Sequence, residues 1–156
     1  MANNPYIVLL QTASTFATNH LEVKRFASDF LEQLGNWATT SEDYPILYAV
    51  PGPITVDGAN PFSELANYTI TFYALDIIQK DRANINTILN STSQILLDLF
   101  KYYTQTEILD IDVISASSLQ PLNNYLLDYV AGWSMTITFE ADTHSYCDVP
   151  IDPPLL

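Results

Sequence analysis

Two groups of side chains in this sequence have types and spacings that could support chemistry. His144 and Cys147 have the spacing of half a zinc site, and Asp110 and Asp112 alternate as paired catalytic carboxylates can. A closed structural zinc site needs four ligands, mostly cysteine and histidine. The chain has one cysteine and only one further histidine, His20. The sequence therefore predicts no metal site and no cofactor.

The two aspartates fit an exposed strand face as well as they fit catalysis. General acid–base catalysis needs a partner base or a positioned nucleophile, and neither accompanies Asp110 and Asp112. The sequence contains no Gly-x-Ser-x-Gly nucleophile motif, and its four glycines do not cluster into a phosphate-binding loop. We therefore expect that the protein is not an enzyme.

The charge balance is strongly acidic and limits the possible partners. Lys and Arg number 5 against 18 Asp and Glu, which gives a net charge of −13 over 156 residues. Proteins that bind nucleic acid neutralise phosphates with clustered cations, so we expect no specific binding of DNA or RNA. The apolar runs are much shorter than the roughly 20 residues that span a bilayer, so we expect no membrane partner.

Hydrophobic periodicity predicts two helices. Asn4-Pro5 is typical of a helix start, and apolar residues then recur at helical spacing to about Asn19. A second apolar stripe, with spacings of three and four, runs from Ile85 to Tyr103. The conformation of residues 21–34 stays open, because their apolar residues fit either a helical face or short strands.

Four segments have the pattern of β-strands. Tyr44–Val50 places alternate apolar side chains on one face and is expected to stop at Pro51-Gly52-Pro53. Tyr68–Ile78 is rich in β-branched and aromatic residues, and Leu109–Val113 alternates apolar with acidic residues. The clearest strand is Trp133–Phe139, whose apolar side chains we expect to form a core face beneath the second helix.

These elements together predict a single α+β domain over residues 1–142. Its sheet is expected to be mainly antiparallel, with about four strands and with two helices on one face. Residues 143–156 are expected to form an extended C-terminal arm, because Pro150, Pro153 and Pro154 cannot continue a helix or a central strand.

Three kinds of residue are candidates for contacts between subunits. Partly exposed tyrosines are common at protein interfaces, and scarce cations on an acidic protein suit a neighbour's carboxylates. Apolar side chains of an extended arm need a partner to cover them. The alternative for each single cation is a local ion pair. The candidates are Lys80, Arg82, Tyr102, Tyr103, Ile151, Leu155 and Leu156.

Several stretches, read in order, resemble small virion proteins of tailed phages. They are Asn19-His20-Leu21, Tyr44–Tyr48, the strand–helix unit from Ala74 to Leu99, and Asp128–Trp133 with Cys147 behind it. The chain is similar in these stretches to tail-completion, tail-terminator and neck-ring (head–tail connector) proteins, including those of crAss-like phages. A closing element of Asp, Gly-Trp and an alternating strand recurs among these proteins.

The resemblance implies an α+β subunit of a homo-oligomeric ring, with six or twelve copies, at the head–tail junction or in the tail. It implies localisation to the virion after assembly in the host cytoplasm, with adjacent portal, connector or tail proteins as partners. DNA would pass through such a ring without specific binding, and no catalytic residue is implied. For residues 21–34 the resemblance favours strand or loop.

Two other functions stay open from the sequence. One is a small acidic ligand-binding module or enzyme. The other is an assembly adaptor that is not part of the mature virion.

Overall fold

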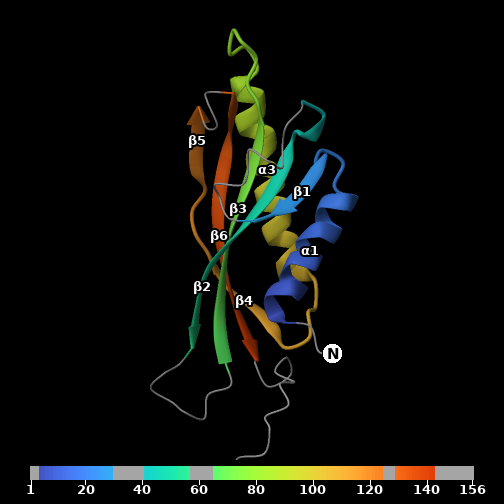
Figure 1. Ribbon diagram of the computed structural model, residues 1–156, viewed down its shortest axis with the longest axis vertical. Coiled ribbons are helices and arrows are strands. Elements are labelled where there is room, and N and C mark those ends of the chain that lie inside the picture. The colour runs from blue at the N-terminus through green and yellow to red at the C-terminus, as the bar shows by residue number, and fades with distance from the viewer. Residues whose placement is uncertain (1–3, 30–40, 57–64, 125–128, 143–156) are drawn as a thin grey trace, which may run out of the picture.

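The computed structural model describes residues 4–29, 41–56, 65–124 and 129–142. Over these ranges the chain forms two α-helices, a short 3-10 helix and one mixed sheet of six strands (Figure 1). In chain order the elements are α1 (Pro5–Asn19), β1 (Arg25–Ser28), η2 (Ser41–Asp43), β2 (Ile46–Val56), β3 (Leu65–Ile77), α3 (Ile85–Gln105), β4 (Ile111–Ala116), β5 (Gln120–Asn124) and β6 (Val130–Asp142). The α+β class is confirmed, and the expected arm, residues 143–156, lies outside the described residues.

The sheet is larger than the expected four strands and is mixed. Its order is β1-β2-β3-β6-β4, and β5 also pairs with β6. β1 runs parallel to β2, whereas every other pairing is antiparallel. The sequence pattern did not predict β5, and it left the segment that contains β1 undecided. The structure describes that segment as a strand over Arg25–Ser28, and residues 30–34 lie outside the described ranges.

β2 continues through Pro51-Gly52-Pro53, where the sequence predicts a stop, and ends at Val56. Its register against β3 shifts at this point, so the strand contains a bulge. Among the described strands, β1 pairs with β2 only as far as Ala49, so the following part of β2 is a strand edge. Prolines are tolerated on such an edge, because no ladder hydrogen bond is lost there. Gly52 suits the bulge, since a Cβ would lie 2.8 Å from the carbonyl oxygen of Thr69.

β3 and β6 form the centre of the sheet. Their thirteen residues pair in unbroken antiparallel register, from Leu65 opposite Asp142 to Ile77 opposite Val130. The predicted alternation in the last strand is confirmed, because its apolar side chains pack into one core with α3. Those side chains are Met135, Ile137 and Phe139, which are buried, and Trp133, which is partly buried.

Gly132 marks a close approach between the two central strands. A Cβ at this residue would collide with the backbone carbonyl of Ala74. The next residue, Trp133, donates its indole N–H to the carbonyl oxygen of Leu89 in α3 (2.8 Å). The same short stretch of β6 therefore fixes both the spacing of the strands and the position of the long helix.

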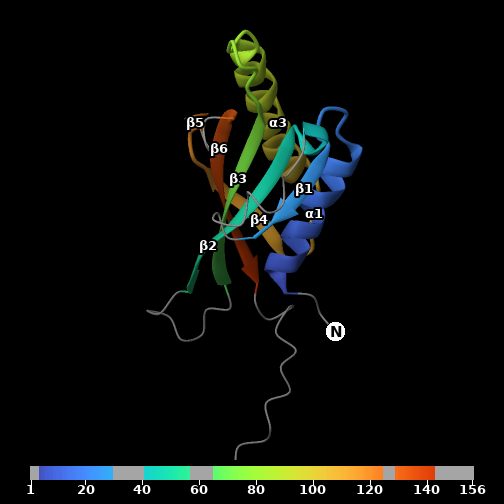
Figure 2. The same cartoon turned by 45° about the horizontal axis from the view of Figure 1, so that its top comes forward.

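Both helices pack on the same face of the sheet (Figure 2). α1 begins as predicted, because the Asn4 side chain accepts a hydrogen bond from the Tyr6 amide (2.8 Å) and Pro5 occupies the first helical position. α1 and α3 are joined in the core by Tyr103, whose hydroxyl donates to the carbonyl oxygen of Leu9 (2.6 Å).

The opposite face of the sheet carries a second apolar cluster. Ile46, Tyr48 and Leu75 are fully buried there, and Tyr44 and Val50 pack against them. The prediction that alternate residues of this strand share one face is confirmed. The adjacent β2 residues face the helices, so this half of β2 is buried on both sides.

The core position of Phe139 gives the first test. Its ring is fully buried and packs against Tyr103, with ring centroids 4.8 Å apart. Phe139→Ala should lower the free energy of unfolding by about 3–5 kcal/mol in a urea titration. The control is Leu109→Ala, at a side chain 77% exposed, for which we expect a change within about 0.5 kcal/mol. A loss below about 1 kcal/mol for Phe139→Ala would contradict the core assignment.

Candidate functional site

Two groups of described charged side chains lie at the two ends of the β3–β6 pair. At one end, β6 stops and β4 begins, and the Asp142 amide donates to the carbonyl oxygen of Asp110 (3.0 Å). Asp112 of β4 lies directly opposite Glu140 of β6. Like charges opposite each other in a ladder are destabilising. We call this the acidic end and define it as Glu107, Asp110, Asp112, Glu140 and Asp142.

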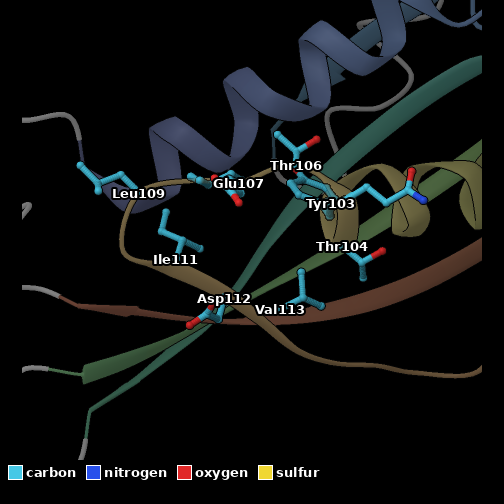
Figure 3. Close-up of a pocket in the computed structure, with 10 residues that line it drawn as sticks. Tyr103, Thr104, Thr106, Glu107, Leu109, Ile111, Asp112 and Val113 are labelled. Carbon is cyan, nitrogen blue, oxygen red and sulfur yellow. The ribbon is translucent and has the colours of Figure 1, made fainter.

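A cavity of about 650 Å³ opens at the acidic end, between the last turn of α3 and the start of β4 (Figure 3). Glu107 and Asp112 contribute carboxylates to its wall, and Figure 3 shows the apolar side chain of Ile111 between them. Tyr103 also lines the cavity, but its hydroxyl is committed to Leu9. The described lining contains no histidine, cysteine, lysine or arginine. It therefore offers carboxylates and threonine hydroxyls, without the aligned base and nucleophile of a hydrolytic site.

The two aspartates considered for catalysis do not share one strand face. Asp110 precedes β4 in a left-handed backbone conformation, with a φ of 58°, and only Asp112 lies on the strand. The predicted alternation from Leu109 is wrong for the same reason: the turn places Leu109 outside the strand, where it is 77% exposed, and β4 begins at Ile111.

The opposite end of the β3–β6 pair is the turn between β3 and α3. We call it the cationic turn and define it as residues 78–84, in which Lys80 and Arg82 flank Asp81. Both cations are exposed, and the turn lies beyond the end of the sheet in Figure 1. Their predicted place between a strand and the long helix is confirmed.

Side chains of the cationic turn hold its backbone in shape. The amide group of Asn84 accepts from the Gln79 N–H (2.9 Å) and donates to the carbonyl oxygen of Ile77 (3.0 Å). Asp81 accepts from the Ala83 amide (3.0 Å). Arg82 has a left-handed φ of 57°. These hydrogen bonds fix the backbone of the turn, so Lys80 and Arg82 extend from defined backbone positions.

The two tyrosines at the end of α3, Tyr102 and Tyr103, differ in burial. Tyr102 is partly buried and packs on Phe16, with ring centroids 5.5 Å apart. Tyr103 is only 2% exposed, so the expectation that it is a partly exposed interface residue is wrong. Burial also raises the pKa of the Tyr103 hydroxyl. The helical stripe that contains this residue points to the core, and the hydroxyl is satisfied there by Leu9.

The histidine of the described region has a local role. His20 accepts from the Glu22 amide through Nδ1 (3.3 Å), and its Nε2 lies 3.4 Å from Asp98 of α3. Within the ranges that the structure describes, no group of three or more His, Cys, Asp or Glu is placed to hold a metal ion. The zinc half-site and the arm candidates, His144, Cys147, Ile151, Leu155 and Leu156, lie outside those ranges.

One polar group was missed by sequence reasoning. Asp76 lies near the end of β3, where desolvation raises the pKa of its carboxyl, although the Ile77 amide donates to it (2.7 Å). Burial raises the pKa of Tyr44, and the negative charges of Asp43 and Asp76 raise it further. The only signal for Asp76 in the sequence is its position in a strand rich in apolar residues. That signal does not distinguish a half-buried carboxylate from an exposed one.

Comparison with known proteins gives no match: neither a protein-family model nor a curated protein matches the chain. No helix in the described part of the chain is long and apolar enough to cross a membrane. The geometry of the two charged ends is therefore the basis for assigning a function.

The partial burial of Asp76 gives a pH-dependent test. Burial raises the pKa of this carboxyl in the folded state above the ordinary aspartate value of 3.8. The protonated carboxyl therefore contributes stability below pH 3.8, and this contribution is lost as the pH rises through the folded pKa. Asp76→Asn keeps an acceptor for the Ile77 amide and removes the charge. We expect the variant to be more stable than the wild type at pH 7, with the difference disappearing toward pH 3 in urea titrations.

The control for net charge is Glu22→Gln, at an exposed position between α1 and β1. It also removes one negative charge from the chain. If both variants gave the same difference from the wild type at every pH, the effect would be general charge repulsion, and the assignment to burial of Asp76 would fail.

Proposed function

We propose that this protein is a structural protein of a tailed-phage virion that assembles with copies of itself into a ring at the head–tail junction or in the tail. The observation that carries the proposal is the separation of charge along the molecule. The acidic end and the cationic turn are at opposite ends of the thirteen-residue β3 strand, which are roughly 40 Å apart at 3.3 Å per residue.

Two opposite ends of unlike charge suit a subunit that joins its neighbours end to end. Lys80 and Arg82 of one ring would meet carboxylates of an adjacent ring, portal, connector or tail protein. Complementary charges of this kind fix register and partner choice. The work of the protein is then mechanical rather than catalytic, and its site residues are those that touch other subunits.

The acidic balance also suits a ring through which DNA passes. Binding of DNA depends on neutralising phosphates and releasing counterions. A subunit with a net charge of −13 repels the duplex instead, so DNA slides without specific binding. The ring would contain six or twelve copies, assembled in the host cytoplasm and carried into the virion.

The cavity at the acidic end favours one alternative, a small acidic ligand-binding module. The two functions differ in the mass of the protein in solution. A persistent monomer of 17.5 kDa by light scattering would favour the module, whereas a larger particle of defined mass would favour the ring. Mass spectrometry of purified virions separates a virion component from an adaptor that leaves before maturation.

The cationic turn provides a test of the end-to-end contact. Reversal of both cations in Lys80→Glu/Arg82→Glu should raise the concentration needed for the end-to-end joining of rings by about tenfold or more, because like charges then face each other. Circular dichroism should be unchanged, since both side chains are exposed. The readout is sedimentation of a concentration series.

A pair of variants with equal net charge gives the control. Lys80→Gln/Arg82→Gln and Lys101→Glu each lower the net charge of the chain by two, and Lys101 is an exposed residue of α3. Only the first should weaken the end-to-end joining of rings. Equal effects of the two variants would show that the turn acts through net charge alone and would contradict the proposed contact.

The second test concerns residues 143–156, which we propose to be an assembly arm. β6 ends at Asp142, paired with Leu65, so truncation after Asp142 leaves every described strand whole. We expect the truncated subunit to keep the melting temperature of the wild-type monomer and to fail to enter particles. Normal incorporation would show that the arm is dispensable, and a large fall in melting temperature would show that it packs within its own subunit.

A further inference from the structure

α1 lacks the charges that a surface helix normally carries. Solvent-facing sides of amphipathic helices are usually charged or polar, yet Pro5–Asn19 contains no Asp, Glu, Lys or Arg in a chain with a net charge of −13. Ile7, Gln11, Thr15 and Thr18 recur at spacings of four, four and three and are all exposed. They form a continuous uncharged stripe along the outer side of the helix.

Three threonine hydroxyl groups of α1 are already satisfied within the helix. Thr12, Thr15 and Thr18 each donate to the carbonyl oxygen four residues earlier, at 2.9 Å. Burial of a polar group is costly mainly when it leaves a donor without a partner. Covering this stripe would therefore leave these donors paired, which lowers the cost of removing the helix face from water.

An apolar groove extends the uncharged surface beyond the start of α1. It has a volume of about 310 Å³ and lies between Ile7 of α1, the bulge of β2 and Tyr68 of β3. Ile54, on the far wall, is 56% exposed, and Ile7 is 46% exposed. None of the described residues that line this groove is charged. We call the stripe and the groove together the α1 flank.

A second uncharged surface lies at the opposite edge of the sheet. β4 and β5 follow each other along β6, and no described strand pairs beyond them. The sequence from Val113 to Leu122 contains no charged residue, and Ile114 is 51% exposed. Ser115 and Gln120 are exposed as well. Figure 1 shows β5 and α1 on opposite sides of the sheet. We call residues 113–122 the β4–β5 edge.

The charge pattern determines which partner fits these surfaces. Two copies that each carry a net charge of −13 repel each other wherever acidic surfaces meet, and contact costs least where no charge is present. A basic partner would instead bind the acidic end. Two different contact surfaces on opposite sides of one subunit generate a ring when the rotation between copies closes, whereas a single self-complementary surface generates only a dimer.

We propose that the α1 flank of one copy packs against the β4–β5 edge of the next copy, and that this is the lateral contact of the ring. The inference rests on the proposed function and deepens it by naming the partner surface. Covering an open strand edge with a helix is a common way to protect it. Lateral contacts are then uncharged, and the charged ends are left for contacts along the ring axis.

Crosslinking tests the pairing of the two surfaces. In a Cys147→Ser background, Gln11→Cys and Ser115→Cys are combined in one chain and treated with a flexible bismaleimide reagent. We expect a ladder of two, three and more linked subunits from the double variant and only monomers from either single variant. Dimers from Gln11→Cys alone would overturn the proposal, because they would show α1 packed on α1.

Light scattering on the same samples distinguishes failure of this contact from failure of the ring. A multi-subunit mass without a ladder would overturn the lateral contact and leave the proposed function standing. A monomer mass without a ladder would overturn both.

Added charge provides an independent test with a matched control. Gln11→Glu/Thr15→Glu places two carboxylates on the exposed stripe of α1, and Asn90→Glu/Leu97→Glu places two on exposed positions of α3 away from the cationic turn. The first should raise the concentration for assembly by about tenfold or more, and the second should have a much smaller effect. Equal effects would contradict the α1 flank as an interface.

Discussion

The unbroken pairing of β3 with β6 is the constraint on which the rest of the structure depends. Thirteen residues on each strand are in register, and Gly132 lets the two backbones approach where any side chain would collide with Ala74. The same register turns Phe72 and Phe139 toward the helices, where both pack on Tyr103. The hydroxyl of Tyr103 then reaches Leu9 and holds α1 to α3. A slip of one residue would turn these side chains to the other face.

The long β3–β6 pair also determines where charged and uncharged surfaces of the molecule lie. Because β3 leads into the cationic turn and β6 stops beside β4, a group of charged residues lies at each end of the pair. The two sides, α1 and the β4–β5 edge, are left without charge. For a protein with a net charge of −13, copies in the proposed ring would meet at surfaces without charged side chains. The acidic residues at one end, such as Asp112 opposite Glu140, would face a partner in the proposed assembly.

Long and regular patterns in the sequence predicted the fold best. The two helices and the alternation in β6 were predicted because periods of 3.6 and 2 are local properties. β1 could not be predicted from the sequence, because a four-residue parallel strand depends on β2, a non-local partner. Of the site, the place of Lys80 in a turn was predictable, whereas the burial of Tyr103 was not, because a tyrosine at the edge of an apolar stripe suits core and interface alike.

The central claim is that copies of this chain form a closed ring, and the mass of the intact assembly tests it most directly. Native mass spectrometry of the full chain over a concentration series should show one dominant species at six or twelve times the subunit mass of 17.5 kDa. A closed ring should not gain single subunits as the concentration rises, so any larger species should be a whole multiple of the ring mass, from rings joined end to end. A 17.5 kDa species alone at every concentration, or a continuous series of masses without a preferred number of copies, would contradict the account.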